Sequence, residues 1–368
     1  MNYNTDVSRR LQPEKIERVV VRGANWVGDA VMTVPALREL RRVLPRAHIT
    51  LATRAWAEGI FRGADFLDDI LISDETASAA RSVLREARGW RARRFDLAVL
   101  FPNAFAPALV AALARVPARV GYATQGRRPL LTHTLQVPDW RGLRHEVFYY
   151  LNIVAELERM LHGSSSLESN EPHTGLAVSD ERRQEAREFL RESGARLERT
   201  LVALCPGSTN SRAKRWPAER FAALADSLVE RSGAEVVLIG AGEELDVSEE
   251  VARRMRKRPV VLTGKIELGQ TVAVLSVADL LVTNDTGPAH VAAAVGCPVV
   301  VIFGPTNPVT TRPLSTLALV VSEPPRCAPC MLRDCPIDHR CMTAITADDV
   351  YARAVRVLEA RRGAEVAR

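Results

Sequence analysis

The chain has 368 residues, of which 47% are hydrophobic and 26% are charged, and its formal net charge at pH 7 is +6. A chain of this length is too long for one hydrophobic core of ordinary size, which predicts two domains. The composition is that of a soluble globular protein, which excludes a membrane-embedded chain. The excess of basic over acidic residues suits an anionic partner: a nucleotide, a phospholipid head group or a nucleic acid.

The first fifteen residues, MNYNTDVSRRLQPEK, are polar and lack the apolar segment of a signal peptide. No run of about 18 apolar residues is present further along. We therefore expect a cytoplasmic protein whose cysteines do not form disulfides.

Short apolar runs alternate with helical stretches through the first half of the chain. The runs predict strands at 18–22, 48–53, 69–73 and 95–101, with an extended piece at 119–122. The stretches between them predict helices over 30–43, 55–62, 77–90, 104–114 and 144–161. Strands that alternate with helices indicate βαβ units and a parallel sheet.

A polar segment, HGSSSLESNEPHTG at 162–175, separates this half from the next. It is rich in Ser, Gly, Asn and Pro, which is typical of a linker. We place the domains at 1–170 and 171–368.

The second half repeats the alternation. Strands are predicted at 200–205, 235–240, 260–264, 279–285 and 298–304, and helices over 179–193, 217–232, 243–256, 268–277, 287–295 and 347–361. The strands are continuous Val/Leu/Ile runs, as expected when both faces of a sheet are covered. Two doubly wound α/β halves would bind ligands beyond the carboxyl ends of their strands, at a cleft between the halves.

A carboxylate, Asp29, comes after the first predicted strand beside Gly28, in the segment RGANWVGDAV. One interpretation is a helix cap, since negative charge is favoured at a helix N-terminus. The other is a general base that points into a cleft.

The segment NDTGPAH, 284–290, comes after the strand at 279–283 and opens a helix. Backbone N–H groups of Thr286, Gly287 and Ala289 would face outward with the helix dipole behind them, which predicts a phosphate site. His290, one turn further, could reach the same anion. The alternative is that Asp285 and Thr286 only cap the helix and His290 packs internally.

Two more glycine-containing turns lie directly after strands. PGSTNSRAKRW, 206–216, combines small hydroxyl residues with Arg212, Lys214 and Arg215, a set that fits a pyrophosphate or forms a solvated basic loop. GAGEE, after the strand at 235–240, lacks the third glycine of the dinucleotide fingerprint, but an acidic residue there could accept from ribose hydroxyls.

Four cysteines, Cys327, Cys330, Cys335 and Cys341, cluster with His339 near the C-terminus. The first pair has the spacing of zinc ligands, and the second pair is looser. A structural metal, reduced cysteines in a packed loop and redox-labile thiols all remain open. We favour the packed loop without metal, because an α/β core needs no metal to fold.

Four segments resemble, in this order, the ADP-heptose–lipopolysaccharide heptosyltransferases of glycosyltransferase family 9: RGANWVGDAVMTVPALREL, PGSTNSRAKRWP, VTNDTGPAHVAAAVG and IFGPTNP. CAPCMLRDCPIDHRCM is most similar to the heptosyltransferase II branch. The resemblance implies a GT-B fold, in which two Rossmann-like domains face each other across a cleft. Residues 1–170 would bind the acceptor, and residues 171–368 would bind the nucleotide sugar.

The resemblance also implies an inverting, metal-independent and cofactor-free transfer from ADP-L-glycero-D-manno-heptose to the inner-core heptose of lipopolysaccharide. The family's catalytic carboxylate falls on Asp29 and its ribose-binding glutamate on Glu243 or Glu244. The expected donor-binding residues are Ser208, Thr209, Lys214, Glu243, Asp285, Thr286, Gly287 and His290.

The acceptor would approach the backbone at Gly28, and Arg127 and Arg128 would contact acceptor phosphates or lipid head groups. We therefore expect a peripheral protein at the inner face of the cytoplasmic membrane, without a nucleic-acid partner. A GT-B transferase with another donor or glycolipid acceptor is an alternative. A zinc-bearing nucleic-acid-binding protein is disfavoured by the 5% aromatic content, and a non-catalytic nucleotide sensor would not need Asp29.

Overall fold

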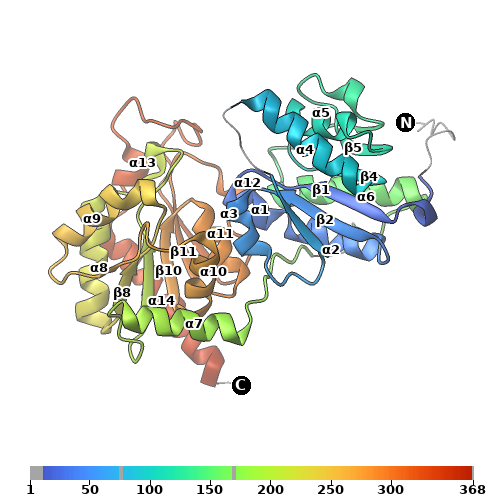
Figure 1. Ribbon diagram of the computed structural model, residues 1–368. Helices are drawn as coiled ribbons and strands as arrows, with labels where there is room; N and C mark the ends of the chain where they lie inside the picture. Colours follow the sequence, from blue (N-terminus) through green and yellow to red (C-terminus); the bar gives the residue numbers. More distant parts are fainter. Residues whose placement is uncertain (1–10, 74–77, 168–170, 367–368) are drawn as a thin grey trace. The chain divides into compact units, whose positions relative to one another are not determined.

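The computed structural model describes residues 11–73, 78–167 and 171–366, which form two compact units (Figure 1). Unit 1 comprises Met1–Glu58 and Ala64–His173, and unit 2 comprises Gly59–Gly63 and Thr174–Arg368. Among the described residues, every helix is too short or too polar to cross a lipid bilayer.

Unit 1 contains a parallel sheet with the strand order β3-β2-β1-β4-β5-β6. In its centre, Val20 of β1 is in register with Thr50 of β2 and Ala98 of β4. The strands are β1 (Arg18–Arg22), β2 (His48–Thr53), β3 (Asp69–Ile72), β4 (Leu97–Leu100), β5 (Ala118–Tyr122) and β6 (His133–Leu135).

Helices cover both faces of this sheet. They are α1 (Val27–Met32), α2 (Val34–Val43), α4 (Ala79–Arg93), α5 (Phe105–Leu113) and α6 (Glu146–His162), with 3-10 turns η2 (Pro13–Lys15) and η3 (Arg128–Leu130). Helix α3 (Ala55–Phe61) begins in unit 1 and ends in unit 2. Helices α4 and α5 pack together, and their buried side chains join Val20 and Ala98 in one core. Helices α1, α2 and α6 contact one another on the opposite face, toward which Val19 and Val21 point because strand side chains alternate.

Unit 2 repeats the architecture with a parallel sheet ordered β12-β11-β10-β7-β8-β9. The strands are β7 (Leu201–Cys205), β8 (Glu235–Leu238), β9 (Val260–Val261), β10 (Leu280–Asn284), β11 (Val299–Phe303) and β12 (Ala318–Ser322). Numbered within each unit, both sheets have the order 3-2-1-4-5-6, which is that of the Rossmann fold.

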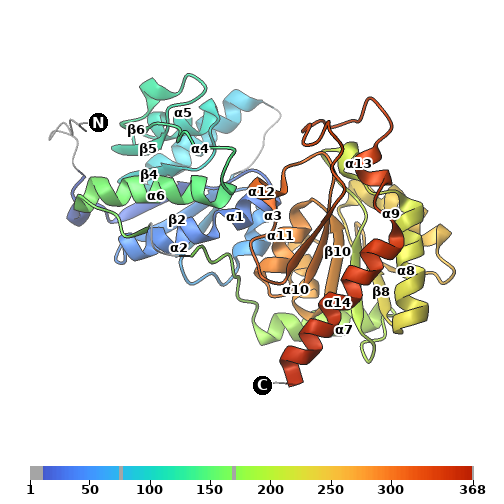
Figure 2. The ribbon, with the colours of Figure 1, turned by 180° about the vertical axis from the view of Figure 1, so that it is seen from behind.

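The helices of unit 2 also form two layers around their sheet (Figure 2). They are α7 (Asp180–Glu192), α8 (Ala218–Ser232), α9 (Leu245–Arg254), α10 (Leu268–Val277), α11 (Gly287–Ala294), α12 (Pro308–Thr311), α13 (Arg340–Thr343) and α14 (Ala347–Val366), with 3-10 turns η5 (Arg212–Lys214) and η6 (Gly242–Glu244). Side chains of α8, α9 and α14 form one large core with β7 and β10, whereas α10 contacts α7 and α11.

The sequence-based elements are largely confirmed, with informative differences. The helix expected over 30–43 begins earlier, at Val27, and is interrupted at Thr33. Pro35 has no N–H group and cannot donate the next backbone hydrogen bond of the helix. The Thr33 hydroxyl donates to the carbonyl of Ala30 at 2.7 Å. Strands β6 and β12 were not predicted: β6 is short and polar, and β12 is an edge strand directly before a proline-rich loop.

Candidate functional site

The clearest cluster of charges in unit 2 joins the ends of β7, β10 and β11. Lys214, in the turn after β7, donates to Asp285 Oδ2 at 2.8 Å and to the Asp285 carbonyl at 3.1 Å. Thr306, which lies after β11, donates to the same carboxylate oxygen at 2.7 Å. Asp285 is buried, whereas the Lys214 side chain is 27% exposed. An ammonium has three N–H donors, so one remains for an anion outside this pair.

The first turn of α11 lies directly beside that pair. Thr286 is the N-cap residue, but its side chain makes no capping hydrogen bond, and the Asp285 carboxylate is bonded to Lys214 instead. The interpretation of these two residues as simple caps is therefore wrong. The N–H of Ala289, expected to face outward, donates to the Thr286 carbonyl at 3.1 Å. Thr286 and Gly287 are half-buried, and their backbone N–H groups are the remaining predicted anion donors. His290 is buried one turn further along.

One buried amide, Asn284, holds both ends of the segment 206–216. Its Nδ2 donates to the carbonyls of Pro206 at 2.8 Å and Gly207 at 3.1 Å. Its Oδ1 accepts from the backbone N–H of Trp216 at 3.0 Å. Sequence reasoning missed this role, although Asn is the first residue of the NDTGPAH motif. Asn284 thereby fixes the turn that presents Lys214.

Glu244 lies with the predicted donor-binding residues. Its carboxylate accepts from the Ala241 N–H at 2.9 Å and from the Thr209 hydroxyl at 3.1 Å, so it joins the turns after β8 and β7. A Cβ at Gly207 would lie 2.3 Å from Glu244 Cδ, so only glycine admits this carboxylate. Glu243 is exposed on the same 3-10 turn and stays, with Glu244, a candidate ribose contact.

The two hydroxyl residues of this turn that were predicted to bind the donor differ. Thr209 is exposed and bonded to Glu244, whereas Ser208 is buried. The carbonyl of Ser208 accepts from Arg215 Nε at 3.3 Å and Nη2 at 3.2 Å. Ser208 therefore contributes to the turn from its inner side.

In unit 1, Asp29 is the third residue of α1 and lies in its first turn, while Trp26 occupies the N-cap position. The Tyr150 hydroxyl, from α6, donates to Asp29 Oδ1 at 3.0 Å. Asp29 is half-buried and Tyr150 is buried. Sequence reasoning did not find Tyr150, because the two residues are 121 positions apart. The tyrosine orients the carboxylate that the sequence analysis singled out.

Charges around Tyr150 shape this part of unit 1. Burial, and then the nearby Asp29 carboxylate, raise the pKa of Tyr150 well above its usual value, so its hydroxyl stays a neutral donor. Burial also raises the pKa of Glu146, and Asp29 adds to this shift. Arg141, 4.0 Å from the Glu146 carboxylate, lowers that pKa in opposition.

The prediction for Arg127 is corrected by its burial. Its side chain is 0% exposed, and Nε donates to the Tyr122 carbonyl at 2.8 Å. Nη1 donates to the carbonyls of Pro102 and Ala104, so the guanidinium holds the loop after β4 to the end of β5. Burial lowers the pKa of Arg127 to about 10. Arg128 is exposed and Gly28 is half-buried, and both remain candidate acceptor contacts.

The cysteine-rich loop after β12 is mostly exposed, and only Cys341 of its cysteines is buried. Burial raises the pKa of Cys341, and the three other cysteines add to the shift. His339 Nε2 lies 2.6 Å from the Ala213 carbonyl, which ties the loop to the turn of Lys214. Within the described ranges, no group of three or more His, Cys, Asp or Glu side chains is arranged to hold a metal ion.

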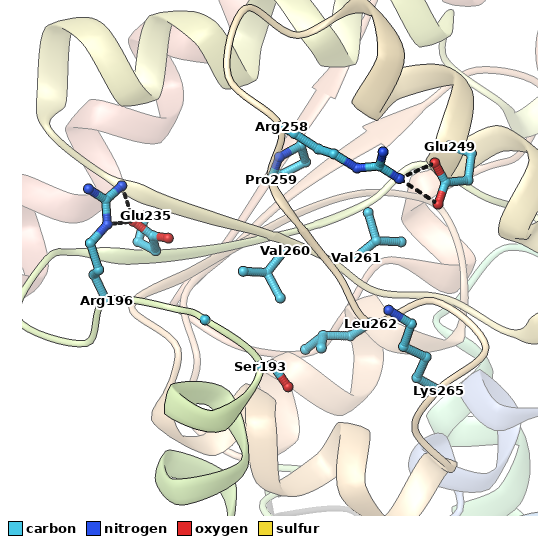
Figure 3. Close-up of a pocket in the computed structure, with 11 residues that line it drawn as sticks. Ser193, Arg196, Glu235, Glu249, Arg258, Pro259, Val260, Val261, Leu262 and Lys265 are labelled. Carbon is cyan, nitrogen blue, oxygen red and sulfur yellow. Dashed lines mark hydrogen bonds and ion pairs between the residues drawn. The ribbon is translucent and has the colours of Figure 1, made fainter.

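A polar hollow of about 490 Å³ lies elsewhere in unit 2, along the edge strand β9 (Figure 3). Two of its arginines are already paired: Arg196 lies 2.8 Å from Glu235, and Arg258 lies 3.0 Å from Glu249. The residues that line it include none of the predicted site residues. We assign no ligand to it.

Each unit thus brings its distinctive residues to the end of its first strand. In a sheet ordered 3-2-1-4-5-6, the connections of strands 1 and 4 run in opposite directions and leave a crevice at their carboxyl ends. In unit 2 this position carries a cation, N–H donors and an acidic residue, which suit a nucleoside diphosphate. In unit 1 it carries a carboxylate with a tyrosine donor, which suits proton transfer.

Comparison with known proteins identifies the family. The model of glycosyltransferase family 9 (heptosyltransferase) matches residues 83–340. Lipopolysaccharide heptosyltransferase 2 of Escherichia coli K12 is 29% identical over 311 residues, covering 83% of this chain and 87% of that protein. Lipooligosaccharide heptosyltransferase 2 of Haemophilus ducreyi is 27% identical, with 83% and 88% covered.

A solved structure, of E. coli ADP-heptose lps heptosyltransferase II, is 26% identical to this chain with a TM-score of 0.78. The match covers 94% of this chain and 99% of that one. The glycosyl transferase family 9 structure from Veillonella parvula is also 26% identical, with a TM-score of 0.79. These likenesses confirm the predicted GT-B fold class with two Rossmann-like domains.

Proposed function

Because this chain belongs to glycosyltransferase family 9, the heptosyltransferases, we propose that it transfers a heptosyl unit from ADP-heptose to the inner-core heptose of lipopolysaccharide. The observation that carries the proposal is the pair of strand-end sites. Unit 2 holds Lys214 and the first turn of α11 side by side, and unit 1 holds Asp29 on a tyrosine donor.

In this reaction an acceptor hydroxyl attacks the anomeric carbon of the donor heptose. The new C–O bond forms on one face while the bond from that carbon to the ADP oxygen breaks on the other, which inverts the configuration. Positive charge develops on the sugar, as in glycoside hydrolysis. The enzyme must therefore accept one proton and stabilise the departing diphosphate.

We assign the proton to Asp29. A carboxylate can accept it from the acceptor hydroxyl as the nucleophile attacks. Tyr150 is bonded to Oδ1 and fixes the orientation of the group. Gly28, which precedes Asp29 in α1, presents no side chain to the approaching acceptor sugar.

We assign the diphosphate to unit 2. The third N–H of Lys214 and the backbone N–H groups of Thr286 and Gly287 would bind its oxygens, with Asp285 and Thr306 holding the lysine in place. Glu244, supported by Thr209, is a candidate acceptor for ribose hydroxyls. The residues assigned here act without a metal or cofactor.

The test is incubation of the purified protein with ADP-heptose and truncated lipopolysaccharides, with ADP release and the mass of the product as readouts. We expect ADP release that depends on an acceptor carrying inner-core heptose, and a product heavier by one heptosyl unit. Parallel reactions with UDP- and GDP-sugars examine the alternative of another donor. Binding of ADP-heptose without transfer to any acceptor would instead favour a nucleotide sensor and overturn the proposal.

The acceptor is anchored in a membrane by its lipid, so the proposal includes peripheral association with the inner face of the cytoplasmic membrane. The formal net charge of +6 suits anionic lipids. Sedimentation with vesicles of differing anionic lipid content checks this part, and binding that depends on neither lipid charge nor salt would contradict it.

A further inference from the structure

Helix α4 of unit 1 carries a row of arginines on its outer face. Arg81, Arg85, Arg88 and Arg91 are all exposed. Their spacing of four, three and three residues places them on one side of a helix. The opposite side of α4 is fixed to the core through Ala87 and Trp90, which are buried. The row therefore cannot turn inward and faces solvent.

The row is also free of neutralising carboxylates among the described residues. None of its four arginines makes an ion pair there, in contrast to most surface arginines of unit 2. The helix contains five arginines and a single acidic residue, Glu86, and that glutamate lies 3.6 Å from Arg22 of β1. The positive potential of the row is thus not cancelled within its own helix.

An apolar side chain lies inside the row. Leu84 is 46% exposed and precedes Arg85 and Arg88 on the same side of α4. A helix with a cationic face and an exposed leucine matches a bilayer surface, where anionic head groups surround accessible hydrocarbon. Nucleic-acid binding is less favoured, because the aromatic residue of α4, Trp90, is 0% exposed and cannot stack on bases.

The position of α4 in the sheet fits the proposed acceptor. The helix comes after β3, so its N-terminal end, with Arg81 and Arg85, lies at the carboxyl edge of the parallel sheet. Asp29 comes after β1 at the same edge, and Figure 1 shows α4 and α5 together over one face of the unit 1 sheet. A bilayer against this row would hold a lipid-anchored acceptor near the edge that carries the carboxylate.

We propose that the exposed face of α4, made by Arg81, Leu84, Arg85, Arg88 and Arg91, is the surface through which the protein docks on anionic membranes. This inference rests on the proposed function for the identity of the lipid-linked acceptor. It replaces Arg127, which is buried, as the basic contact with lipid head groups.

The test compares two charge reversals of equal size. Arg81→Glu/Arg85→Glu alters the row, and Arg187→Glu/Arg191→Glu alters two exposed arginines with the same spacing on α7 of unit 2. Binding is measured by sedimentation with vesicles of phosphatidylcholine alone or with 30 mol% phosphatidylglycerol. We expect the α4 variant to bind the anionic vesicles roughly 30-fold more weakly and the α7 variant to bind like the wild type. Equal binding by all three proteins would overturn the proposal.

Three further measurements separate the possible failures. Leu84→Gln should weaken binding at 0.5 M salt, where charge is screened, and an unchanged partition there would remove the apolar contact from the proposal.

Transfer to a deacylated acceptor without vesicles should be the same in the α4 variant and the wild type. If the wild type makes no product in that assay, the proposed function fails. The vesicle measurements still decide whether the exposed face of α4 binds anionic membranes. Loss of duplex DNA binding in the α4 variant, with vesicle binding intact, would assign the row to nucleic acid instead.

Discussion

The two units share a strand order but differ in the segments that connect their first and fourth strands to the next helix. After β1 of unit 1, a short helix presents Asp29, and after β4 comes the apolar helix α5. After β7 of unit 2, a basic turn presents Lys214, and after β10 comes Asp285 with the first turn of α11. The doubly wound sheet thus supplies equivalent positions in both units, while the side chains placed there determine the chemistry.

The difference predicts that turnover and donor binding respond to different units. Substitutions in unit 1 should slow the transfer step and leave the affinity for ADP-heptose intact. Substitutions in unit 2 should weaken the donor complex. Variants in each unit test whether turnover and donor binding separate in this way.

The largest effect is expected from Asp29→Asn. Asparagine keeps the shape and the oxygen that accepts from Tyr150, but it cannot take a proton from the acceptor. Turnover should fall by about 10²–10⁴-fold. Calorimetric titration with ADP-heptose should give an unchanged dissociation constant, and thermal melting should change little. Near-wild-type turnover would end the assignment of Asp29 as base.

Lys214→Ala should weaken ADP-heptose binding next most strongly. A charge-assisted hydrogen bond to phosphate contributes about 1.5–3 kcal/mol, which corresponds to roughly 10- to 150-fold in affinity. The variant also leaves the buried Asp285 carboxylate with Thr306 as its side-chain donor, so its melting temperature must be compared with that of Lys214→Arg. A donor affinity equal to that of the wild type would place the phosphates elsewhere.

A smaller effect is expected from Tyr150→Phe. The hydroxyl stabilises the charged form of Asp29, so its removal should lower turnover by about 2- to 12-fold and move the acid limb of the kcat profile to higher pH. The neighbouring Tyr149→Phe is the matched control, because the Tyr149 hydroxyl bonds to Asn103. A lower turnover without a shift of the acid limb would indicate a packing role alone.

The smallest effect is expected from Cys327→Ser. If the cysteine loop of unit 2 is a packed loop without metal, this exposed residue can change without altering the melting temperature. Elemental analysis of the purified protein should find no stoichiometric zinc. One zinc per chain, lost in the variant, would reverse the prediction and give unit 2 a metal centre.

Sequence periodicity was sufficient to predict most of the fold, because buried parallel strands are continuous apolar runs. The rule that ligands bind at carboxyl strand ends was sufficient to bring Lys214 and Asp285 together, 71 positions apart. The rule does not predict the hydrogen bond between Lys214 and Asp285, because the partner of a buried carboxylate depends on the path of the intervening loop.

Other features depend on packing that one sequence does not encode locally. The difference between Glu243 and Glu244 depends on the phase of a single 3-10 turn, which leaves one exposed and the other buried. The segment GRRPL gives no sign that Arg127 is buried while Arg128 is exposed. Tyr150 reaches Asp29 only because α6 packs against α1.

The hydrogen bonds of Asn284 have a consequence for the timing of synthesis. The turn that presents Lys214 is fastened at both ends by a side chain up to 78 positions later in the chain. While the ribosome is still extending the region between β7 and β10, Lys214 already exists but its turn has no anchor. A nascent chain that ends before Asn284 should therefore not retain ADP-heptose, and nucleotide binding should appear only after β10 has emerged and paired with β7.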